Sequence, residues 1–350
     1  MTRPQPNITA RKRRQSWRYT AIAAAGAILL LVVLLVSLNS GYTPLSPQDM
    51  LRILTGGGSG SENLILLQFR LPRFALAALA GAGLALSGGI IQAIARNPLA
   101  DPGLLGINAG AGLMVIIYVL FFGVQSWLSV FTLPFLALAG AGLAAVLIYG
   151  LALKDGEGAA PLRLILTGLA VQAGLSALTT VLVVKLDETQ FDFVATWQAG
   201  SIGGGDWRFV LALLPWLLLL TPYALRKARV LDVLQLGDET ACGLGAAVEQ
   251  ERRLLLAAAV ALAASCVAVS GGISFVGLLA PHLSRRLTGP VHARLLPVAA
   301  LAGAVLVAAA DCLARIIAQP TEIPAGIMVA VIGAPYFLYL LARSSTVERS

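Results

Sequence analysis

Long apolar segments, separated by short polar ones, run through almost the whole chain. An α-helix needs about 20 apolar residues to cross the hydrocarbon core of a bilayer. A hydropathy window predicts ten such segments, of which one is too short to cross alone. They are 19–38, 73–94, 104–122, 127–153, 162–184, 209–225, 254–270, the short 275–287, 295–318 and 326–341. The pattern therefore predicts an all-α polytopic membrane protein.

The composition agrees with this pattern. Of the 350 residues, 58% are hydrophobic and 12% are charged, and the mean hydropathy is +0.84. Soluble domains carry about 25% charged residues. The composition excludes a soluble protein and leaves too little polar sequence for a separate soluble domain.

The net charge of +8 is distributed unevenly along the predicted loops. If the N-terminus is cytoplasmic, nineteen of the 25 basic residues fall on the cytoplasmic side, as the positive-inside rule requires. The six on or near the outer side are Arg52, Arg70, Arg73, Lys185, Arg208 and Arg315. We therefore expect both termini inside, and the charge reflects topology rather than nucleic-acid binding.

The N-terminus carries four consecutive basic residues, 11–14, before the first apolar segment. A secretory signal peptide has this order, but the 19–38 segment is longer than a usual signal core, and residues 37–40 are a poor cleavage site. An uncleaved first span is the better interpretation. We expect a cytoplasmic basic segment at 1–18, a single transmembrane domain at 19–343 and a cytoplasmic tail at 344–350.

Residues that could carry catalysis, a cofactor or a metal are scarce. Cys242, Cys266 and Cys312 stand apart from each other and from histidine, which favours packing roles. No Gly-Lys-Ser/Thr phosphate loop occurs, so any nucleotide that powers the protein is bound by another chain. The sequence predicts no catalytic, cofactor-binding or metal-binding residue.

A few polar residues lie within the apolar segments. Asp311 and Arg315 are four apart, so they share a helix face and can form an ion pair. This pair is either a structural neutralisation or functional, since charges are costly in a membrane. Gln92, Asn108 and Gln172 are predicted to form hydrogen bonds between helices. Glycines at 81, 83, 88, 89, 106, 110, 140 and 142 predict close helix packing.

Two loops contain predicted short helices. In the outer loop, residues 46–54 have a cap, a proline and apolar positions that indicate a short amphipathic helix ending at Gly56. The longest inner loop, about 231–253, has room for two short helices broken at Gly243 and Gly245. This inner loop is either a solvated connector or a surface on which a cytoplasmic partner docks.

Several motifs in one order resemble the FecCD-type permease subunit of binding-protein-dependent ABC importers for iron–siderophore, haem and cobalamin. The motifs are Arg70-Leu71-Pro72-Arg73, 96–103 (RNPLADPG), Trp197-Gln198-Ala199-Gly200-Ser201, 237–245, Phe275-Val276-Gly277-Leu278 with Pro281-His282, Ala310-Asp311 with Arg315, and Glu322-Ile323-Pro324-Ala325-Gly326. They cover nearly the whole chain after the first span.

The resemblance implies a type II ABC importer permease in the bacterial cytoplasmic (inner) membrane. Its partners would be a second permease, identical or paralogous, two cytoplasmic ATPase subunits, an external substrate-binding protein and membrane lipid. Arg70, Arg73 and Arg315 would dock the binding protein, and the fifth and tenth spans would line the path. The ATPase would contact Leu236, Gly237, Asp238, Glu239, Ala241, Gly243, Leu244 and Gly245. The expected substrate is an iron(III)–siderophore complex, with haem or cobalamin as alternatives.

Two other function classes are weaker. A secondary transporter driven by protons or sodium would need acidic residues at mid-membrane, and the spans contain only Asp311, with Arg315 beside it. A membrane-embedded enzyme would need a catalytic constellation that the spans lack. We therefore expect a permease without catalysis of its own.

Overall fold

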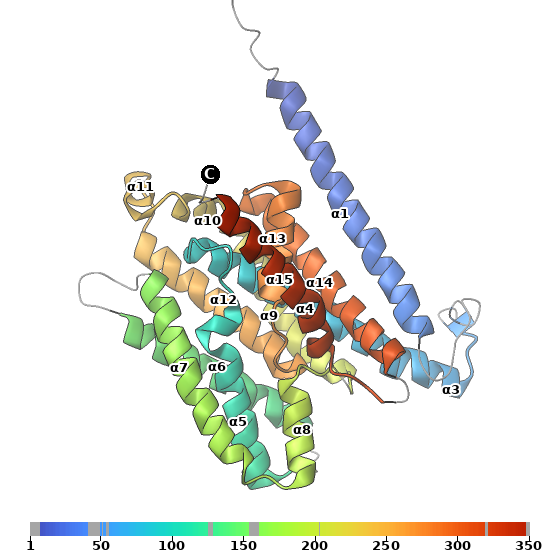
Figure 1. Cartoon of the computed structure of the whole chain (residues 1–350). Helices are drawn as coiled ribbons and strands as arrows, with labels where there is room; N and C mark the ends of the chain where they lie inside the picture. Colours follow the sequence, from blue (N-terminus) through green and yellow to red (C-terminus); the bar gives the residue numbers. More distant parts are fainter. Residues whose placement is uncertain are drawn as a thin grey trace, which may run out of the picture.

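The computed structural model of the chain describes residues 8–40, 50, 52–53, 56–124, 129–153, 161–202, 204–318 and 321–347. These residues form helices that pack side by side in one bundle, with no strand among them (Figure 1). The prediction of an all-α fold is confirmed.

Each of the ten predicted apolar segments corresponds to a helix. Within the described residues, seven helices are long and apolar enough to cross a membrane, two are shorter apolar helices, and α13 is the short segment. Their bounds are α1 (Ile8–Asn39), α4 (Leu71–Ile94), α5 (Ile107–Phe122), α6 (Ser129–Ala152), α7 (Pro161–Val183), α9 (Trp207–Arg226), α12 (Val248–Ser270), α13 (Val276–Thr288), α14 (His292–Ile317) and α15 (Ala325–Val347).

The second span starts earlier than the sequence predicts. Helix begins at Gly60 rather than at residue 73, through α3 (Gly60–Asn63) and the π-helical η1 (Leu64–Arg70). Pro72 has no N–H to donate and its ring crowds the preceding turn. The wider turn before it, in which Leu71 N–H donates to the Leu66 carbonyl, accommodates the proline, so Pro72 does not end the helix.

The core of the bundle is built around α4, which packs against α9, α12, α13 and α14. Gly81 of α4 and Gly303 of α14 approach so closely that a Cβ on either would overlap the other's carbonyl oxygen. Gly110 of α5 and Gly140 of α6 meet in the same way. The predicted role of glycine in close packing is confirmed at these positions. It is wrong for Gly142, whose Cβ position has no neighbouring atom within 4 Å.

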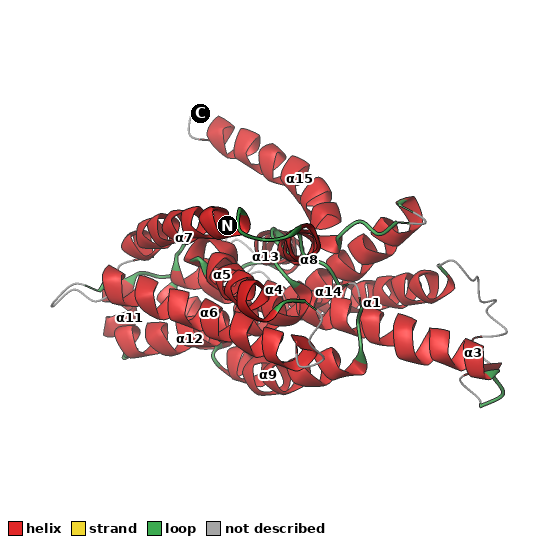
Figure 2. Cartoon of the chain, turned by 90° about the horizontal axis from the view of Figure 1, so that it is seen from below, coloured by secondary structure: helices red, strands yellow, loops and turns green. Residues whose placement is uncertain are grey.

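Three helices lie at the periphery. α1 packs mainly along α14, with Gly26 against Leu301, and leaves much of its surface uncovered (Figure 1). α15 extends from the bundle, with its main contacts to α13 and α14 (Figure 2). α7 contacts α5 and α6 and leaves most of its surface uncovered. These helices have surface available for lipid or a partner chain.

Shorter helices connect the spans. α8 (Glu188–Gln198) begins with a capping box between Asp187 and Gln190, which the sequence reading missed. The inner loop holds α10 (Ala228–Leu234) and α11 (Asp238–Gly243), as predicted in number. The predicted break at Gly243 and Gly245 is present, since α11 ends at Gly243 and Gly245 has a φ of +85°, but it separates α11 from α12. The two short helices are separated from each other at Gly237, whose φ is +105°. η2 (Pro102–Leu105) precedes α5.

Some expectations fall outside the described residues. These are segments 1–7 and 348–350 of the predicted termini, and residues 46–49, 51 and 54 of the outer amphipathic helix. Met50 and Ile53 of that helix are described, and both are buried. Cys266 and Cys312 are buried as predicted, whereas Cys242 is exposed in α11, so a packing role is wrong for it.

Candidate functional site

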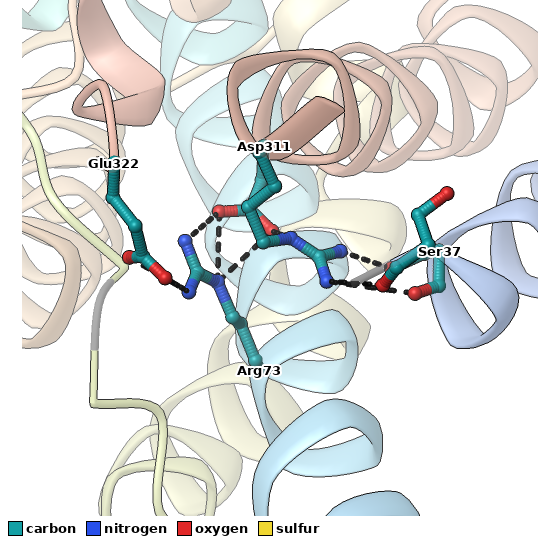
Figure 3. A network of polar contacts seen from close by, with 6 residues as sticks. Ser37, Arg73, Asp311 and Glu322 are labelled. Atoms are coloured by element: carbon teal, nitrogen blue, oxygen red, sulfur yellow. Dashed lines mark hydrogen bonds and ion pairs between the residues drawn. The ribbon is translucent and has the colours of Figure 1, made fainter. Parts of the chain in front are cut away.

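A network of charged side chains joins α4, α14 and the segment before α15 (Figure 3). Asp311, which is 1% exposed, accepts hydrogen bonds from Arg73 Nε at 3.0 Å and Nη2 at 2.9 Å. Arg73 Nη1 donates to both carboxylate oxygens of Glu322, each at 3.0 Å. A buried carboxylate is stable only when it is paired and hydrogen-bonded. Arg73 supplies that pairing for Asp311.

Arg315 extends the network to α1. Its Nε lies 3.3 Å from Asp311 Oδ2, so the contact expected from the four-residue spacing is present. Its Nη2 donates to Ser37 Oγ at 2.5 Å. The pair is not self-contained, since Asp311 is shared with Arg73 and Arg315 also binds the end of α1.

The three arginines expected to dock a binding protein lie at the same end of the bundle. The Arg70 residue is 7% exposed, and its guanidinium donates to the Leu38 carbonyl at the end of α1. The side chains of Arg73 and Arg315 are 12% and 10% exposed. Their docking role stays a prediction. Glu322, 55% exposed in its side chain, is a charged residue of this network to which the sequence reading gave no role.

Two of the sequence motifs, 197–201 and 322–326, meet the turn at Gly271 in one junction. Gly326 N–H, at the start of α15, donates to the Gly200 carbonyl at 2.9 Å. A Cβ on Gly326 would overlap the Ala199 carbonyl oxygen, and one on Gly271 would overlap that of Trp197. Backbone therefore packs directly on backbone where α8, α12 and α15 end or begin. The junction lies beside the break that separates α12 from the short α13.

A polar cavity of about 320 Å³ lies between α5, α7 and α8. Its polar lining residues are Asn108, Gln172, Ser176, Thr179, Thr180, Gln198 and Ser274. Four of them come from α7, the fifth predicted span, which the family resemblance places on the path. The helix α15, which corresponds to the tenth span, contributes no residue to this cavity.

The three polar residues expected to join helices behave differently. Gln92 Nε2 donates to the carbonyls of Gly277 and Leu278, both at 3.2 Å, so its prediction is confirmed. Gln172 Oε1 has no hydrogen-bond partner among the described residues. Gln172 and Asn108 line the cavity, where water or a solute can satisfy them.

On the opposite side of the bundle, Asp238 ties the inner loop to two spans. Both of its carboxylate oxygens accept hydrogen bonds from Arg252 Nη2, each at 2.8 Å. Arg252 lies near the start of α12. It also binds Arg96, which follows α4 and whose Nε donates to the Leu234 carbonyl at 2.9 Å. The sequence reading did not assign Arg96 or Arg252 to this site. Movement of α11 is therefore coupled to the ends of α4 and α12.

The charge state of Asp238 follows from these partners. Burial raises its pKa, but hydrogen bonds and positive charge from Arg252 and Arg96 outweigh burial and place the pKa below its usual value. Asp238 is thus ionised at neutral pH and the ties are charge-assisted.

The rest of the predicted ATPase-contact set is mostly exposed. Leu236 and Leu244 are 59% and 64% exposed on either side of α11, whereas Ala241 is buried. Glu239 and the glycines Gly243 and Gly245 are exposed too, and Gly237 directly precedes α11 as its N-cap. An exposed pair of leucines beside a fixed short helix is a surface that a partner protein can cover.

Comparison with known proteins decides the family. Residues 29–343 match the FecCD transport family. The chain belongs to the FecCD transport family. The resemblance seen in the sequence motifs is confirmed.

Curated relatives of this FecCD-family chain align over nearly their full length. The iron(3+)-hydroxamate import system permease protein FhuG of Bacillus subtilis is 50% identical over 93% of this chain and 97% of its own. The Fe(3+) dicitrate transport system permease protein FecD of Escherichia coli is 41% identical, with shares of 93% and 97%. The hemin transport system permease protein HmuU of Yersinia pestis is 41% identical, with shares of 90% and 93%.

A solved structure has the same fold. It is described as an inward-facing conformation of a metal-chelate type ABC transporter, and it matches with a TM-score of 0.80 and 31% identity over 93% of this chain and 99% of its own. This FecCD-family chain is therefore a multi-pass permease subunit of the ABC importer class. Such subunits are not enzymes, because the ATPase activity of the importer lies in a partner.

Proposed function

We propose that this permease carries an iron(III)–siderophore complex into the cytoplasm, powered by ATP hydrolysis in a partner subunit. The observation that carries the proposal is the 50% identity to an iron-hydroxamate permease over 93% of the chain. A permease for hemin is 41% identical, so haem is the second candidate.

The polar cavity of α5, α7 and α8 is the proposed wall of the path. Its glutamine, asparagine, serine and threonine side chains would be costly against lipid. α7, which supplies four of them, is left largely uncovered by the rest of the chain. We infer that this face of α7 meets a second permease subunit, a copy or a paralogue, across a water-filled path.

The inner loop is the proposed contact with the ATPase, in a topology with both termini cytoplasmic. Leu236 and Leu244 would enter the partner surface, while Asp238 transmits movement of α11 to Arg96 and Arg252. Once the exposed Cys242 is replaced by serine, single cysteines at Leu236 and Leu244 should cross-link to the ATPase in the assembled complex. A cysteine at the buried Ala241 serves as the negative control. Absence of cross-linking at both exposed positions would point to another contact surface.

The proposed docking of the binding protein needs a test that separates docking from folding. Replacing Arg73 with glutamine removes both an arginine and the partner of Asp311. The matched variant Asp311→Asn removes the same ion pair and keeps the arginine. If Arg73 docks the binding protein, Arg73→Gln should lose capture of that protein while Asp311→Asn retains it. Equal capture by the two variants would remove Arg73 from the docking site.

Substrate class is tested by uptake. Cells that depend on this permease and its cognate binding protein should accumulate radioactive iron from a ferric hydroxamate siderophore, and unlabelled hemin in excess should not compete. Competition by hemin with no siderophore uptake would favour the haem alternative.

A further inference from the structure

A cavity of about 300 Å³ lies between α1, near the point where its apolar part begins, and the turn that joins α13 to α14. Arg18 of α1, Arg286 of α13 and Arg294 of α14 line it. The remaining lining comes from Tyr19 and from the turn at 287–291. The cavity is distinct from the polar path, the outer ionic network and the inner loop described above.

The three guanidinium groups have no counter-charge within the described part of the chain. No hydrogen bond or ion pair to a carboxylate joins Arg18, Arg286 or Arg294, and the cavity lining contains no Asp or Glu. By contrast, Arg73, Arg96, Arg252 and Arg315 are all paired with carboxylates. Three like charges around one cavity favour an anionic ligand, and the arginine fork matches phosphate oxygens in geometry.

The cavity lies where the apolar helices end, which is the position of lipid headgroups in a membrane. The apolar part of α1 begins at Trp17, α13 ends at Thr288 and α14 begins at His292. All three arginines thus lie within a few residues of the end of an apolar helix. Trp17, 74% exposed, and Tyr19 are the aromatic residues that gather at a membrane interface.

Apolar surface continues from the cavity toward the membrane interior. Along α1, the side chains of Ile28, Leu29 and Leu31 are exposed, because that helix contacts mainly α14. A ligand with a phosphate at the cavity and hydrocarbon chains along α1 would match both parts. Basic pockets between transmembrane helices at the cytoplasmic surface are typical sites for anionic headgroups.

We propose that this cavity binds the phosphate headgroup of an anionic phospholipid. In the topology proposed above, the lipid belongs to the cytoplasmic leaflet. By bridging Arg18 with Arg286 and Arg294, it fastens α1 to α13 and α14; α1 already packs along α14, but the chain itself provides few contacts between α1 and α13.

The test uses the full-length permease in complex with its ATPase, purified in detergent. Phosphatidylglycerol binding is measured by native mass spectrometry and by the rise in the unfolding temperature, with phosphatidylcholine as the neutral reference. The variant is Arg286→Gln/Arg294→Gln. The matched control is Arg226→Gln/Arg229→Gln, which removes two exposed charges from the same side of the bundle but outside the cavity. Each single replacement is measured as well, in case the double variant fails to fold.

We expect each lost guanidinium to weaken phosphatidylglycerol binding about fivefold, and the pair about 25-fold. The control should stay within about twofold, because its charges do not face the cavity. Unchanged phosphatidylglycerol binding in the cavity variant would overturn the proposal. Equal stabilisation of the unaltered protein by inorganic phosphate would overturn the lipid assignment in favour of a soluble anion. Loss of the ATPase without a change in lipid binding would show that the cavity is a protein contact.

Discussion

Arg73 on α4 and Asp311 on α14 are 238 residues apart in sequence, yet Arg73 Nη2 lies 2.9 Å from Asp311 Oδ1. The same guanidinium reaches Glu322, so one arginine holds a buried and an exposed carboxylate. The contact fixes α4 against α14 and against the segment that leads into α15.

Replacing Asp311 with asparagine should destabilise the permease strongly. The change leaves two arginines without their buried counter-charge, and breaking a buried pair typically costs about 3–5 kcal/mol of the free energy of unfolding. Thermal unfolding in detergent measures it. The matched control is Glu322→Gln, whose exposed pair contributes about 0–1 kcal/mol. Equal losses in the two variants would contradict this assignment.

Asp238→Asn should remove the ties from α11 to α4 and α12. Because the pKa of Asp238 in the folded protein lies below its ordinary value of 3.8, the ion pairs contribute their full stability above that pH. Their contribution is lost as the pH falls through the lower, folded pKa. Unfolding temperatures of wild type and variant should differ by a constant amount from pH 5 to 8 and converge in stronger acid. The control is Glu239→Gln, which alters an exposed carboxylate on the same helix and should leave the unfolding temperature at neutral pH near that of the wild type; an equal loss in the control would argue against the pairing.

Gly326→Ala should destabilise the junction of α8, α12 and α15. The added methyl group would overlap the Ala199 carbonyl oxygen, and overpacking of this kind costs about 1–3 kcal/mol. Gly142→Ala is the matched control, since its Cβ would contact nothing within 4 Å. In a helix interior, that replacement is expected to be neutral or to stabilise by about 0.5–1 kcal/mol. The prediction fails if both variants unfold at the wild-type temperature.

Gln172→Leu should slow uptake without affecting stability. Its amide oxygen has no partner in the described part of the chain, so no structural hydrogen bond at that oxygen is lost. Removal of one neutral hydrogen bond to a solute would reduce uptake about fivefold. Thr167→Val, on the same helix but outside the cavity, is the control. Uptake at the wild-type rate in Gln172→Leu would remove this side chain from the path.

The sequence predicted the ten spans well, because a bilayer imposes length and apolarity on each of them. The predicted helix bounds are wrong where prolines, caps and turns, rather than hydropathy, determine where a helix begins. The hydropathy window starts the second span at residue 73, whereas the helix continues back to Gly60 through the π-helical η1. The hydropathy window predicts no helix at α8, which is short and contains acidic residues, although Asp187 and Gln190 form a capping box at its start.

Among the site residues, the sequence predicts contacts within one helix but not contacts between helices. The Asp311–Arg315 contact could be inferred from helical spacing alone. The contacts of Arg73 with Asp311 and Glu322, and of Asp238 with Arg96, depend on which helices become neighbours. The spacing of residues within one helix cannot identify such pairs, because their members do not lie on the same helix. They are evident only from the arrangement of α4, α11 and α14.

The most direct test of the account is transport in proteoliposomes that contain the permease with its second permease and ATPase subunits. We predict that uptake of a ferric siderophore delivered by the binding protein requires internal ATP and is unaffected when proton and sodium gradients are collapsed. Uptake that continues without the ATPase and ATP, and that follows an ion gradient, would contradict the account.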